Sequence, residues 1–278
     1  MPKQKIFVTR EIPQAGLDFL KGYDIKVFTK DRKIKKSELL LGVKGASAIL
    51  SILTEKIDGQ VLDSAGPQLR IVANYAVGYN NIDLVACDKR GVMVTNTPGV
   101  LTDTVAEHAI AMMMSIARRI PESDRFTRAG KYKSWGPLLL LGSDLRGKTL
   151  GVLGLGRIGQ RVAEIASKGL GMNVIYNDKF IREHKYRYVT LNTIFLKSDF
   201  ISVHVPLLPE TKHLVSAKAL RIMKPGAYLI NTSRGPVIDE KALVKALKKK
   251  KIKMSEFSIQ SLTGGKLRLP SLLIDGKF

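Results

Sequence analysis

The chain has 278 residues, 45% of them hydrophobic, and this length and composition suit a globular protein with two cores. Its one cysteine, Cys87, excludes a disulfide within the chain and fits a reducing compartment. No apolar run reaches the ~18 residues of a membrane span, and the first residues lead into a strand-like run rather than a signal peptide. We therefore expect a cytoplasmic protein without a membrane segment.

The formal net charge of +22 lies mostly in the second part of the chain. Residues 1–98 hold 15 basic and 10 acidic side chains, whereas residues 99–254 hold 28 and 12. A basic surface attracts polyanions such as nucleic acids. The lysines and arginines are spread out, however, with few aromatic residues between them and no nucleic-acid-binding motif. We interpret the charge as solvated helix faces and expect no specific nucleic-acid partner.

Strands and helices alternate along residues 1–97. Expected strands cover residues 5–9, 23–28, 46–52, 70–74 and 93–96, and expected helices cover residues 12–20, 35–41 and 58–64, with one more through Cys87. This alternation is typical of a parallel sheet with helices on both faces. We predict that residues 1–97 form the first of two α/β domains.

A second α/β domain is predicted over residues 98–253. Its first helix, residues 105–120, is nearly all apolar and is expected to be buried behind a cap at residues 102–104. Residues 121–147, around Trp135, are expected to be irregular and could form an arm between domains or subunits. Further strands are expected at residues 149–153, 173–176, 200–205 and 228–231 and near Tyr188, and helices at residues 191–197, 216–223 and after Asp239.

The stretch from Lys148 to Asp178 carries the most specific signal. A short apolar strand is followed by G-x-G-x-x-G at Gly154, Gly156 and Gly159, then by a helical pattern and a second strand that ends in Asp178. In this context the first glycine permits a tight turn. The second lets the backbone approach a pyrophosphate, and the third lets the helix pack closely on the strand. The stretch predicts a dinucleotide site.

The residues after these glycines define that site further. The helix start offers free N–H groups and a positive dipole end to a phosphate, and we assign its first residues, Arg157 and Ile158, to the cofactor. Asp178 would accept hydrogen bonds from ribose hydroxyls, which favours NAD. Lys179 and Arg182 could instead hold a 2′-phosphate, so NADP stays an alternative. The four histidines are scattered, and we expect no metal site.

Several ordered motifs resemble those of the D-isomer-specific 2-hydroxyacid dehydrogenases. They are VGYNNID (77–83), NTPGVLTDTVAEHA (96–109), LRGKTLGVLGLGRIGQRVA (145–163), SDFISVHVPLLPETKHLV (198–215) and MKPGAYLINTSRGPVIDEKAL (223–243). Within the family the chain is most similar to glyoxylate and hydroxypyruvate reductases. The resemblance implies two Rossmann-like domains with parallel sheets: a flavodoxin-like substrate domain and a dinucleotide-binding domain. It also implies a homodimer and a small 2-oxo acid substrate.

The resemblance also implies roles for single residues. Arg234 stands at the position of the catalytic, substrate-binding arginine, whose fork can hold a carboxylate and polarise a carbonyl. The backbone amides of Val77 and Gly78 would bind the substrate carboxylate. The remaining cofactor contacts that it implies are Thr104, His204, Val205, Pro206, Thr232 and Ser233.

The proton donor of the family is not found in these 278 residues. The resemblance implies a glutamate in a pattern like L-D-V-F-x-x-E-P and a later histidine in a pattern like T-P-H. The residues after Lys251 contain neither pattern, and no histidine follows His213. His204 and His108 are the possible substitute acids, although the family pattern places both wrongly for this role.

Four consecutive lysines, residues 248–251, precede the change, and their codons form an A-rich tract. We hypothesise that residues 254–278 are an atypical tail, truncated or frame-shifted, and that the cofactor sheet therefore lacks its final strand.

The sequence thus predicts NAD(P)H-dependent reduction of glyoxylate or hydroxypyruvate to the 2-hydroxy acid, impaired by the missing acid–base histidine. The alternative is a catalytically inactive cofactor-binding or interaction protein, comparable to corepressors on this scaffold.

Overall fold

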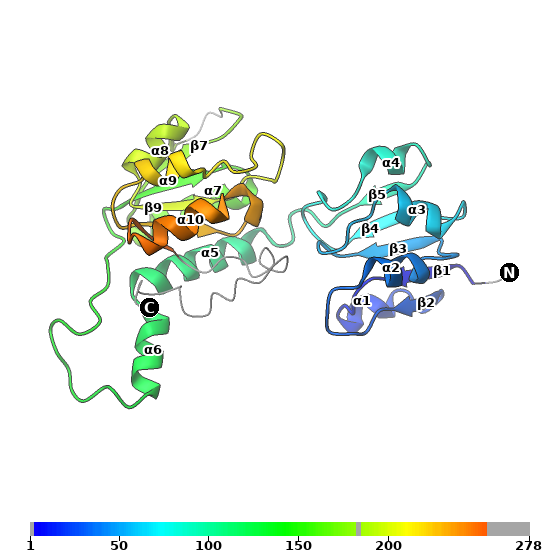
Figure 1. The fold of residues 1–278 in the computed structure, drawn as a ribbon, viewed down its shortest axis with the longest axis horizontal. Helices are drawn as coiled ribbons and strands as arrows, with labels where there is room; N and C mark the ends of the chain where they lie inside the picture. The colour runs from blue at the N-terminus through cyan, green and yellow to red at the C-terminus, as the bar shows by residue number, and fades with distance from the viewer. Residues whose placement is uncertain (1–2, 182–184, 255–278) are drawn as a thin grey trace. The chain divides into compact units, whose positions relative to one another are not determined.

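The computed structural model describes residues 3–181 and 185–254, which form two compact units that divide between Leu101 and Thr102 (Figure 1). Each unit is built on an open sheet whose strands all run parallel. The predicted fold class, two parallel α/β units, is confirmed.

The first unit contains a five-stranded sheet in the order β2-β1-β3-β4-β5, which is the flavodoxin-like order. Its strands are β1 (Lys5–Val8), β2 (Asp24–Val27), β3 (Ala48–Ser51), β4 (Ile71–Asn74) and β5 (Met93–Thr95). Its helices are α1 (Gln14–Asp18), α2 (Lys36–Gly42), α3 (Gly59–Ala65) and α4 (Leu84–Asp88). The strand order reverses between β1 and β3, so loops from the carboxyl ends of neighbouring strands gather there.

One face of this sheet holds the unit's apolar core. Phe7, Ile49 and Val72 of the sheet belong to one buried cluster with side chains of α2, α3 and α4. By contrast, α1 buries no side chain, and Phe19 beyond it is 89% exposed. The helix predicted over residues 12–20 is therefore shorter than expected, because Pro13 fixes its start and little packing extends it.

The second unit contains a six-stranded sheet in the order β11-β10-β9-β6-β7-β8. Its strands are β6 (Thr149–Leu153), β7 (Asn173–Asn177), β8 (Arg187–Tyr188), β9 (Phe200–Val203), β10 (Ala227–Asn231) and β11 (Ile252–Met254). Its helices are α5 (Thr102–Ala117), α6 (Ile120–Arg128), α7 (Arg157–Glu164), α8 (Leu191–Lys197), α9 (Ala217–Ile222) and α10 (Glu240–Lys248). A π-helical turn, Ile165–Gly169, prolongs α7, and Gly235–Val237 is a 3₁₀ turn. The strand order is that of dinucleotide-binding domains, with its reversal between β6 and β9.

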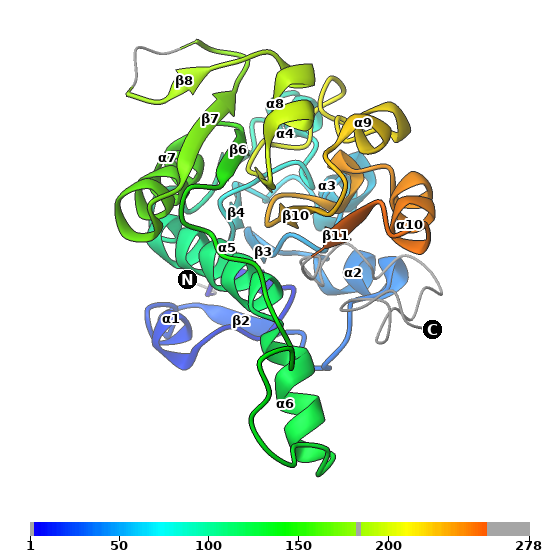
Figure 2. The ribbon, with the colours of Figure 1, turned by 90° about the vertical axis from the view of Figure 1, so that its left-hand side faces the viewer.

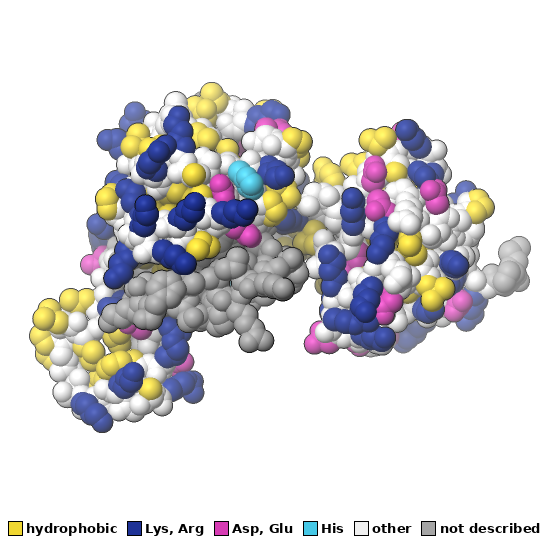
Figure 3. Space-filling model, in the orientation of Figure 1, with side chains coloured by type: hydrophobic (Ala, Val, Ile, Leu, Met, Phe, Trp, Pro, Cys, Tyr) yellow, Lys and Arg dark blue, Asp and Glu magenta, His cyan; other side chains and the backbone are white. Residues whose placement is uncertain are grey.

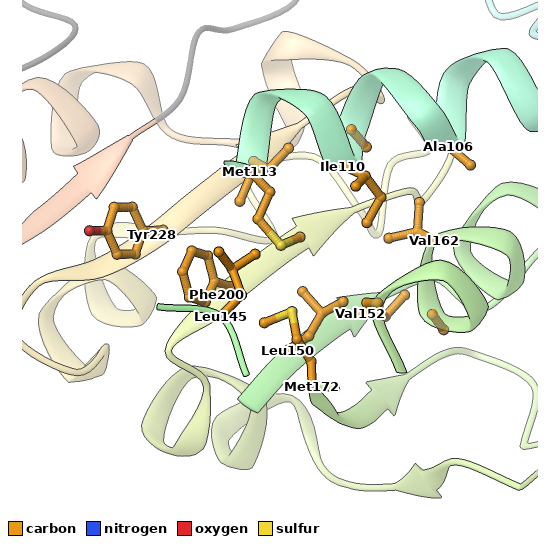
Figure 4. Packing of buried hydrophobic residues seen from close by; sticks show 14 of the residues in the cluster. Ala106, Ile110, Met113, Leu145, Leu150, Val152, Val162, Met172, Phe200 and Tyr228 are labelled. Atoms are coloured by element: carbon orange, nitrogen blue, oxygen red, sulfur yellow. The ribbon is translucent and has the colours of Figure 1, made fainter. Parts of the chain in front are cut away.

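Two apolar layers cover this sheet, with α5 and α7 on one face and α8, α9 and α10 on the other (Figure 2). In the first layer Met113 and Ile110 of α5 lie over the sheet near Phe200 and Tyr228 (Figure 4). The rings of Phe200 and Tyr228 stack with their centroids 4.6 Å apart. The central strands are thus buried on both faces, which accounts for their nearly continuous apolar sequence.

The helix predicted over residues 105–120 differs from the observed α5. It runs from Thr102 to Ala117 and has a buried face and an exposed one, with Glu107 and His108 exposed. Arg119 adopts a left-handed conformation with φ of 55°, which ends α5. The run of alanine, isoleucine and methionine forms the buried face, and the polar residues between them form the exposed face.

The segment expected to be irregular contains a further helix, α6. Pro121 lies in its first turn together with Glu122, and Arg125 and Arg128 lie in its last turn, an arrangement that suits the helix dipole. Asp124 and Arg128 pair at 2.8 Å across one turn. The prediction of irregular structure was wrong for residues 121–128, where these local signals form a helix, and it is confirmed for residues 129–147.

The expectation that the sheet lacks its final strand was also wrong. Ile252 pairs in parallel with Ala227 of β10, and the pairing continues for two more residues. β11 therefore covers this edge of the sheet immediately after the four lysines. Residues 255–278 lie outside the described residues.

None of the helices in the described part of the chain combines the length and the hydrophobicity needed to cross a lipid bilayer.

Candidate functional site

The glycine loop between β6 and α7 leaves no room for side chains at two positions. Gly154 has φ of +89°, and a Cβ atom there would lie 2.9 Å from the backbone nitrogen of Val205. A Cβ atom on Gly159 would lie 2.0 Å from the carbonyl oxygen of Gly154. Both positions therefore require glycine for the packing of the protein itself.

Gly156 differs, because no protein atom lies within 4 Å of the place where its Cβ atom would be. It is the exposed N-cap residue of α7. Gln160 makes the first bond of the helix, to the Gly156 carbonyl at 2.9 Å. The amides of Arg157 and Ile158 therefore have no acceptor within the helix. These amides and the open space beside Gly156 together suit the pyrophosphate of a dinucleotide.

Asp178 joins the end of β7 to this loop. Its Oδ2 atom accepts a hydrogen bond from the amide of Leu155 at 2.6 Å, and its Oδ1 atom accepts one from the amide of Phe180 at 3.0 Å. A carboxylate oxygen has two lone-pair sites, so each oxygen can still accept a bond from a ribose hydroxyl. The chain itself thus fixes the orientation of the carboxylate that the sequence assigned to the ribose.

One of the two cations considered for a 2′-phosphate has an acidic partner. Lys179 forms an exposed ion pair with Glu210 at 3.3 Å. Arg182 lies outside the described residues.

Strand β9 was predicted to reach Val205, but it ends at Val203, and His204 is the next residue. The imidazole lies between two hydroxyl groups, with Nε2 2.8 Å from Ser202 Oγ and Nδ1 3.3 Å from Thr232 Oγ1. Burial lowers the pKa of His204 to about 4. Because the ring is neutral at physiological pH and both nitrogens are engaged, His204 links β9 to the loop after β10 and is poorly suited to donate a proton.

The loops after β9 and β10 are linked by a second contact as well. The Ser233 hydroxyl donates a hydrogen bond to the carbonyl of Val205. Pro206, the next residue, is exposed. The structure therefore brings together four residues that the sequence assigned to the nicotinamide half of the site: His204, Val205, Thr232 and Ser233.

Arg234 is held by a turn that Asn231 organises. Asn231 is the last residue of β10 and is 1% exposed. Its Oδ1 atom accepts a bond from the amide of Ser233 at 3.0 Å, and its Nδ2 group donates to the carbonyl of Arg234 at 3.1 Å. The guanidinium is half-buried, and burial lowers the pKa of Arg234, but an arginine stays cationic at physiological pH. The turn thus places a half-buried cation at the carboxyl end of the sheet, and its Nη1 atom donates to the carbonyl of Ser233 at 3.0 Å.

Thr104 lies in the first turn of α5 with an exposed side chain. Two residues further on, Ala106 packs in the same cluster as Val162 of α7, so the start of α5 lies beside α7 (Figure 4). Among the described residues, Thr104 makes no hydrogen bond to the glycine loop. Its assignment to the cofactor stays a prediction.

In the first unit, Val77 and Gly78 lie in the loop after β4. The carbonyl of Val77 accepts a bond from Asn96 Nδ2, and the carbonyl of Gly78 accepts one from Asn74 Nδ2, both at 2.8 Å. Within the described ranges, neither amide N–H of this pair donates to a protein acceptor. Two such amides in succession can bind a carboxylate.

Three asparagines that hold these loops were missed in the sequence analysis: Asn74, Asn96 and Asn231. The signal was available, because the chain reads IVAN, MVTN and YLIN at the ends of β4, β5 and β10. A buried or half-buried amide at the carboxyl end of a strand needs partners, and loop carbonyls supply them: those of the loop after β4 for Asn74 and Asn96, and that of the loop after β10 for Asn231.

In the described part of the chain, no group of His, Cys, Asp or Glu side chains could hold a metal ion.

Comparison with known proteins agrees with this site. Residues 110–256 match the family described as D-isomer specific 2-hydroxyacid dehydrogenase, NAD binding domain. The chain is also 47% identical to a protein named glyoxylate reductase from Thermococcus litoralis, with 88% of this chain and 77% of the relative covered. The chain belongs to the D-isomer specific 2-hydroxyacid dehydrogenase family.

Solved structures of this dehydrogenase fold are similar along most of the chain. The TT0316 protein of Thermus thermophilus matches with a TM-score of 0.86 and 38% identity, over 95% of this chain and 85% of its own. A D-lactate dehydrogenase from Aquifex aeolicus, solved with NAD and lactic acid, matches with a TM-score of 0.78 and 32% identity, over 92% of this chain and 78% of its own. The chain of 278 residues is thus an NAD-dependent dehydrogenase. The reaction of its family converts a 2-oxo acid to a 2-hydroxy acid.

The open space at Gly156 separates cofactor binding from folding. We expect Gly156→Ala to fold like the wild type, because the added methyl group meets no protein atom, but to weaken NADH binding about 10-fold or more by filling the space in front of the amides. Gly169→Ala is the matched control, since its Cβ atom also meets nothing within 4 Å. NADH fluorescence titration measures both. Unchanged affinity in Gly156→Ala would place the pyrophosphate elsewhere.

The lowered pKa of His204 makes stability depend on pH on the acid side. The unfolded chain binds this proton near pH 6.5 and the folded chain near pH 4. The free energy of unfolding therefore falls as the pH drops from about 6.5 toward 4, by up to about 1.4 kcal/mol per pH unit, and this ring adds no pH dependence above that range. We expect His204→Gln to have a shallower slope in urea unfolding over this range. His213→Gln, at an exposed side chain, is the control, and equal slopes for all three proteins would contradict the expectation.

Proposed function

We propose that this chain reduces glyoxylate, or a 2-oxo acid of similar size, to the 2-hydroxy acid with NADH. The observation that carries the proposal is the half-buried Arg234, fixed by Asn231 in the loop after β10. That loop is joined through His204 and Ser233 to the loop after β9. Relatives from Thermococcus litoralis and Korarchaeum cryptofilum, 47% and 48% identical, are named glyoxylate reductase.

The proposed division of work follows from the chemistry of the groups. NADH supplies the hydride. The guanidinium of Arg234 binds the carboxylate and polarises the carbonyl that receives the hydride. For the first unit, considered by itself, we propose that the successive amides of Val77 and Gly78 are suited to bind a carboxylate. The residues that line the glycine loop hold the cofactor.

The group that donates the proton to the new hydroxyl group determines the expected turnover rate. Of the histidines in the described part of the chain, His204 is neutral and engaged at both nitrogens, and His108 and His213 have exposed side chains. We propose that none of these three histidines donates the proton. A positioned acid contributes typically about 10²–10⁴-fold in rate, so a chain that relies on water for this proton turns over slowly.

The surroundings of these histidines also favour a second candidate function, a protein that binds NAD without turnover. The two candidates differ in one measurement: NADH oxidation with glyoxylate, repeated with added imidazole as an external proton donor. A reductase that lacks its acid oxidises NADH slowly and is accelerated by imidazole. A binding protein takes up NADH and oxidises none in either condition.

We expect Arg234→Lys to lower kcat/KM for glyoxylate by about 10²-fold or more, because lysine keeps the charge but loses the two-pronged donor. Absorbance of NADH measures the reaction. Arg221→Lys, at an exposed position on α9, is the matched control and should leave kcat/KM unchanged. Equal kcat/KM in wild type and Arg234→Lys would remove Arg234 from the reaction.

We further propose that the protein is a cytoplasmic homodimer in which a second copy covers the arm, defined as residues 120–142. The arm exposes large apolar side chains: Ile120, Tyr132, Trp135, Leu138 and Leu141 are all more than half exposed. Hydrophobic side chains also gather over this part of the surface in the space-filling view (Figure 3). In addition, α6 has nine residues and buries none of them, and a helix this short is marginal unless another surface packs on it. The single free Cys87 fits a reducing cytoplasm.

This assembly makes Leu138, 82% exposed, a sensitive position. We expect Leu138→Glu to shift the protein from dimer to monomer, because the carboxylate would have to be buried in an apolar contact. Sedimentation measures the change. Leu196→Glu, at a 50% exposed side chain on α8, is the control and should stay dimeric. A monomeric wild type would contradict the proposed assembly.

A further inference from the structure

The segments that follow β4 and β5 in the first unit are hydrogen-bonded to each other. The two strands pair in parallel, so the residues after them leave the sheet at the same edge. The amide of Thr97 donates to the carbonyl of Ala76 at 2.9 Å. The Nδ2 group of Asn96 donates to the carbonyl of Val77 at 2.8 Å. The segment after β5 thus holds two successive carbonyls of the loop after β4.

These two bonds determine where two amides point. In a trans peptide the C=O group of one residue and the N–H group of the next point in opposite directions. Holding the Ala76 carbonyl turns the amide of Val77 away from the segment after β5, and holding the Val77 carbonyl does the same for the amide of Gly78. In the described ranges neither amide donates to a protein acceptor. Two successive amides of this kind suit a carboxylate.

The two peptides differ in how easily they rotate. The peptide between Ala76 and Val77 is held by a main-chain amide, and the Cβ atom of Val77 restricts rotation on its far side. The peptide between Val77 and Gly78 is held by a side chain, and glycine rotates about φ at little cost. A flip of this second peptide would turn the Val77 carbonyl oxygen to where the Gly78 amide points, and that oxygen repels an anion. The bond from Asn96 opposes the flip.

Asn74, which also contacts this loop, acts on a different peptide. Its Nδ2 group donates to the Gly78 carbonyl at 2.8 Å, and that carbonyl belongs to the peptide between Gly78 and Tyr79. Asn96 therefore holds the peptide that contains the Gly78 amide, and Asn74 holds the next one. Asn96 is also only half-buried, so its side chain can be changed with less damage to the core.

We propose that Asn96 is a positioning residue that directs the Gly78 amide toward the carboxylate of a 2-oxo acid. It acts through the Val77 carbonyl. This inference rests on the proposed function, because it takes the amides of Val77 and Gly78 as a place where that carboxylate binds.

The first test compares Asn96→Asp and Asn96→Ala with the wild-type chain. The aspartate has nearly the size of asparagine, but it cannot donate to the Val77 carbonyl and repels it, whereas alanine only removes the donor. We expect the Kd for oxamate, an unreactive 2-oxo acid analogue, to rise about 10-fold or more in Asn96→Asp and about 3-fold in Asn96→Ala. Calorimetry with NADH-saturated protein measures both values. The Kd for NADH should stay unchanged, because the glycine loop lies in the other unit.

Asn173→Asp is the matched control. The Nδ2 group of Asn173 also donates to a main-chain carbonyl, that of Gly147 at 3.1 Å, but in the second unit and at an exposed side chain. The same chemical change there should leave the Kd values for oxamate and NADH as they are in the wild type. Asn96→Ala decides the test if Asn96→Asp does not fold.

The Gly78 amide can also be observed directly, because the pair Val–Gly occurs once in the sequence. Protein labelled with ¹³C at the valine carbonyl and with ¹⁵N in glycine therefore gives a single correlated amide signal in NMR. We expect oxamate to shift this amide proton downfield in the NADH-saturated wild type, as a hydrogen bond to a carboxylate does. In Asn96→Ala the shift at saturating oxamate should be smaller. A merely structural role of Asn96 would change the unfolding midpoint and leave this shift unaltered.

The outcomes are distinct. A wild-type chain that binds NADH but no oxamate overturns the proposed function and this inference with it. A wild type that binds oxamate without a shift of the Gly78 signal overturns the inference alone, and so does undiminished oxamate binding in the folded Asn96 variants. An equal loss of oxamate binding in Asn173→Asp also overturns it, since the effect would then not depend on the loop after β4.

Discussion

The close contact between α7 and the turn after β6 is the constraint on which the second unit depends. A Cβ atom on Gly159 would lie 2.0 Å from the Gly154 carbonyl, so the helix packs on the strand at a distance that only glycine permits. This contact points the start of α7 at the end of the sheet, where Asp178 is bonded to the Leu155 amide. The packing contact at Gly159 and the hydrogen bond of Asp178 therefore fix the loop around Gly156, the glycine that the fold itself leaves free.

Parallel pairing extends this order across the sheet. In register, Leu153 of β6 lies beside Asn177 of β7 and Val203 of β9, so the loops that follow these strands emerge at one edge. β10 continues the series, because its Asn231 pairs with Val203. The glycine loop, the His204 loop and the Arg234 turn are thus brought together by strand register, and the side chains between them adjust a geometry that the backbone already sets.

Periodicity and glycine spacing were enough to predict the central strands and the cofactor loop. The limits of β6 and α8 agree with the predicted ranges, because buried strands and capped helices carry strong local signals. The arm was harder to predict. The formation of its helix α6 depends on Pro121 and on charge placement rather than on an apolar face. Outside the arm, β11 was hard to predict because it is only three residues long. The position of Asn74 and Asn231 at the ends of apolar strands can be read from the sequence, but their partners cannot, since each donates to a carbonyl that only the folded loop brings within reach.

In both units, a buried asparagine at the end of a strand holds the loop that follows the strand. Asn74 ends β4 and Asn231 ends β10, both are almost completely buried, and each donates its amide to a carbonyl of the following loop, at Gly78 or at Arg234. A short loop at the end of a strand is held more rigidly by one buried amide than by solvent-exposed contacts, because the amide loses its hydrogen bonds if the loop moves. The requirement for a fixed loop therefore explains why polar side chains occupy the ends of two otherwise apolar strands.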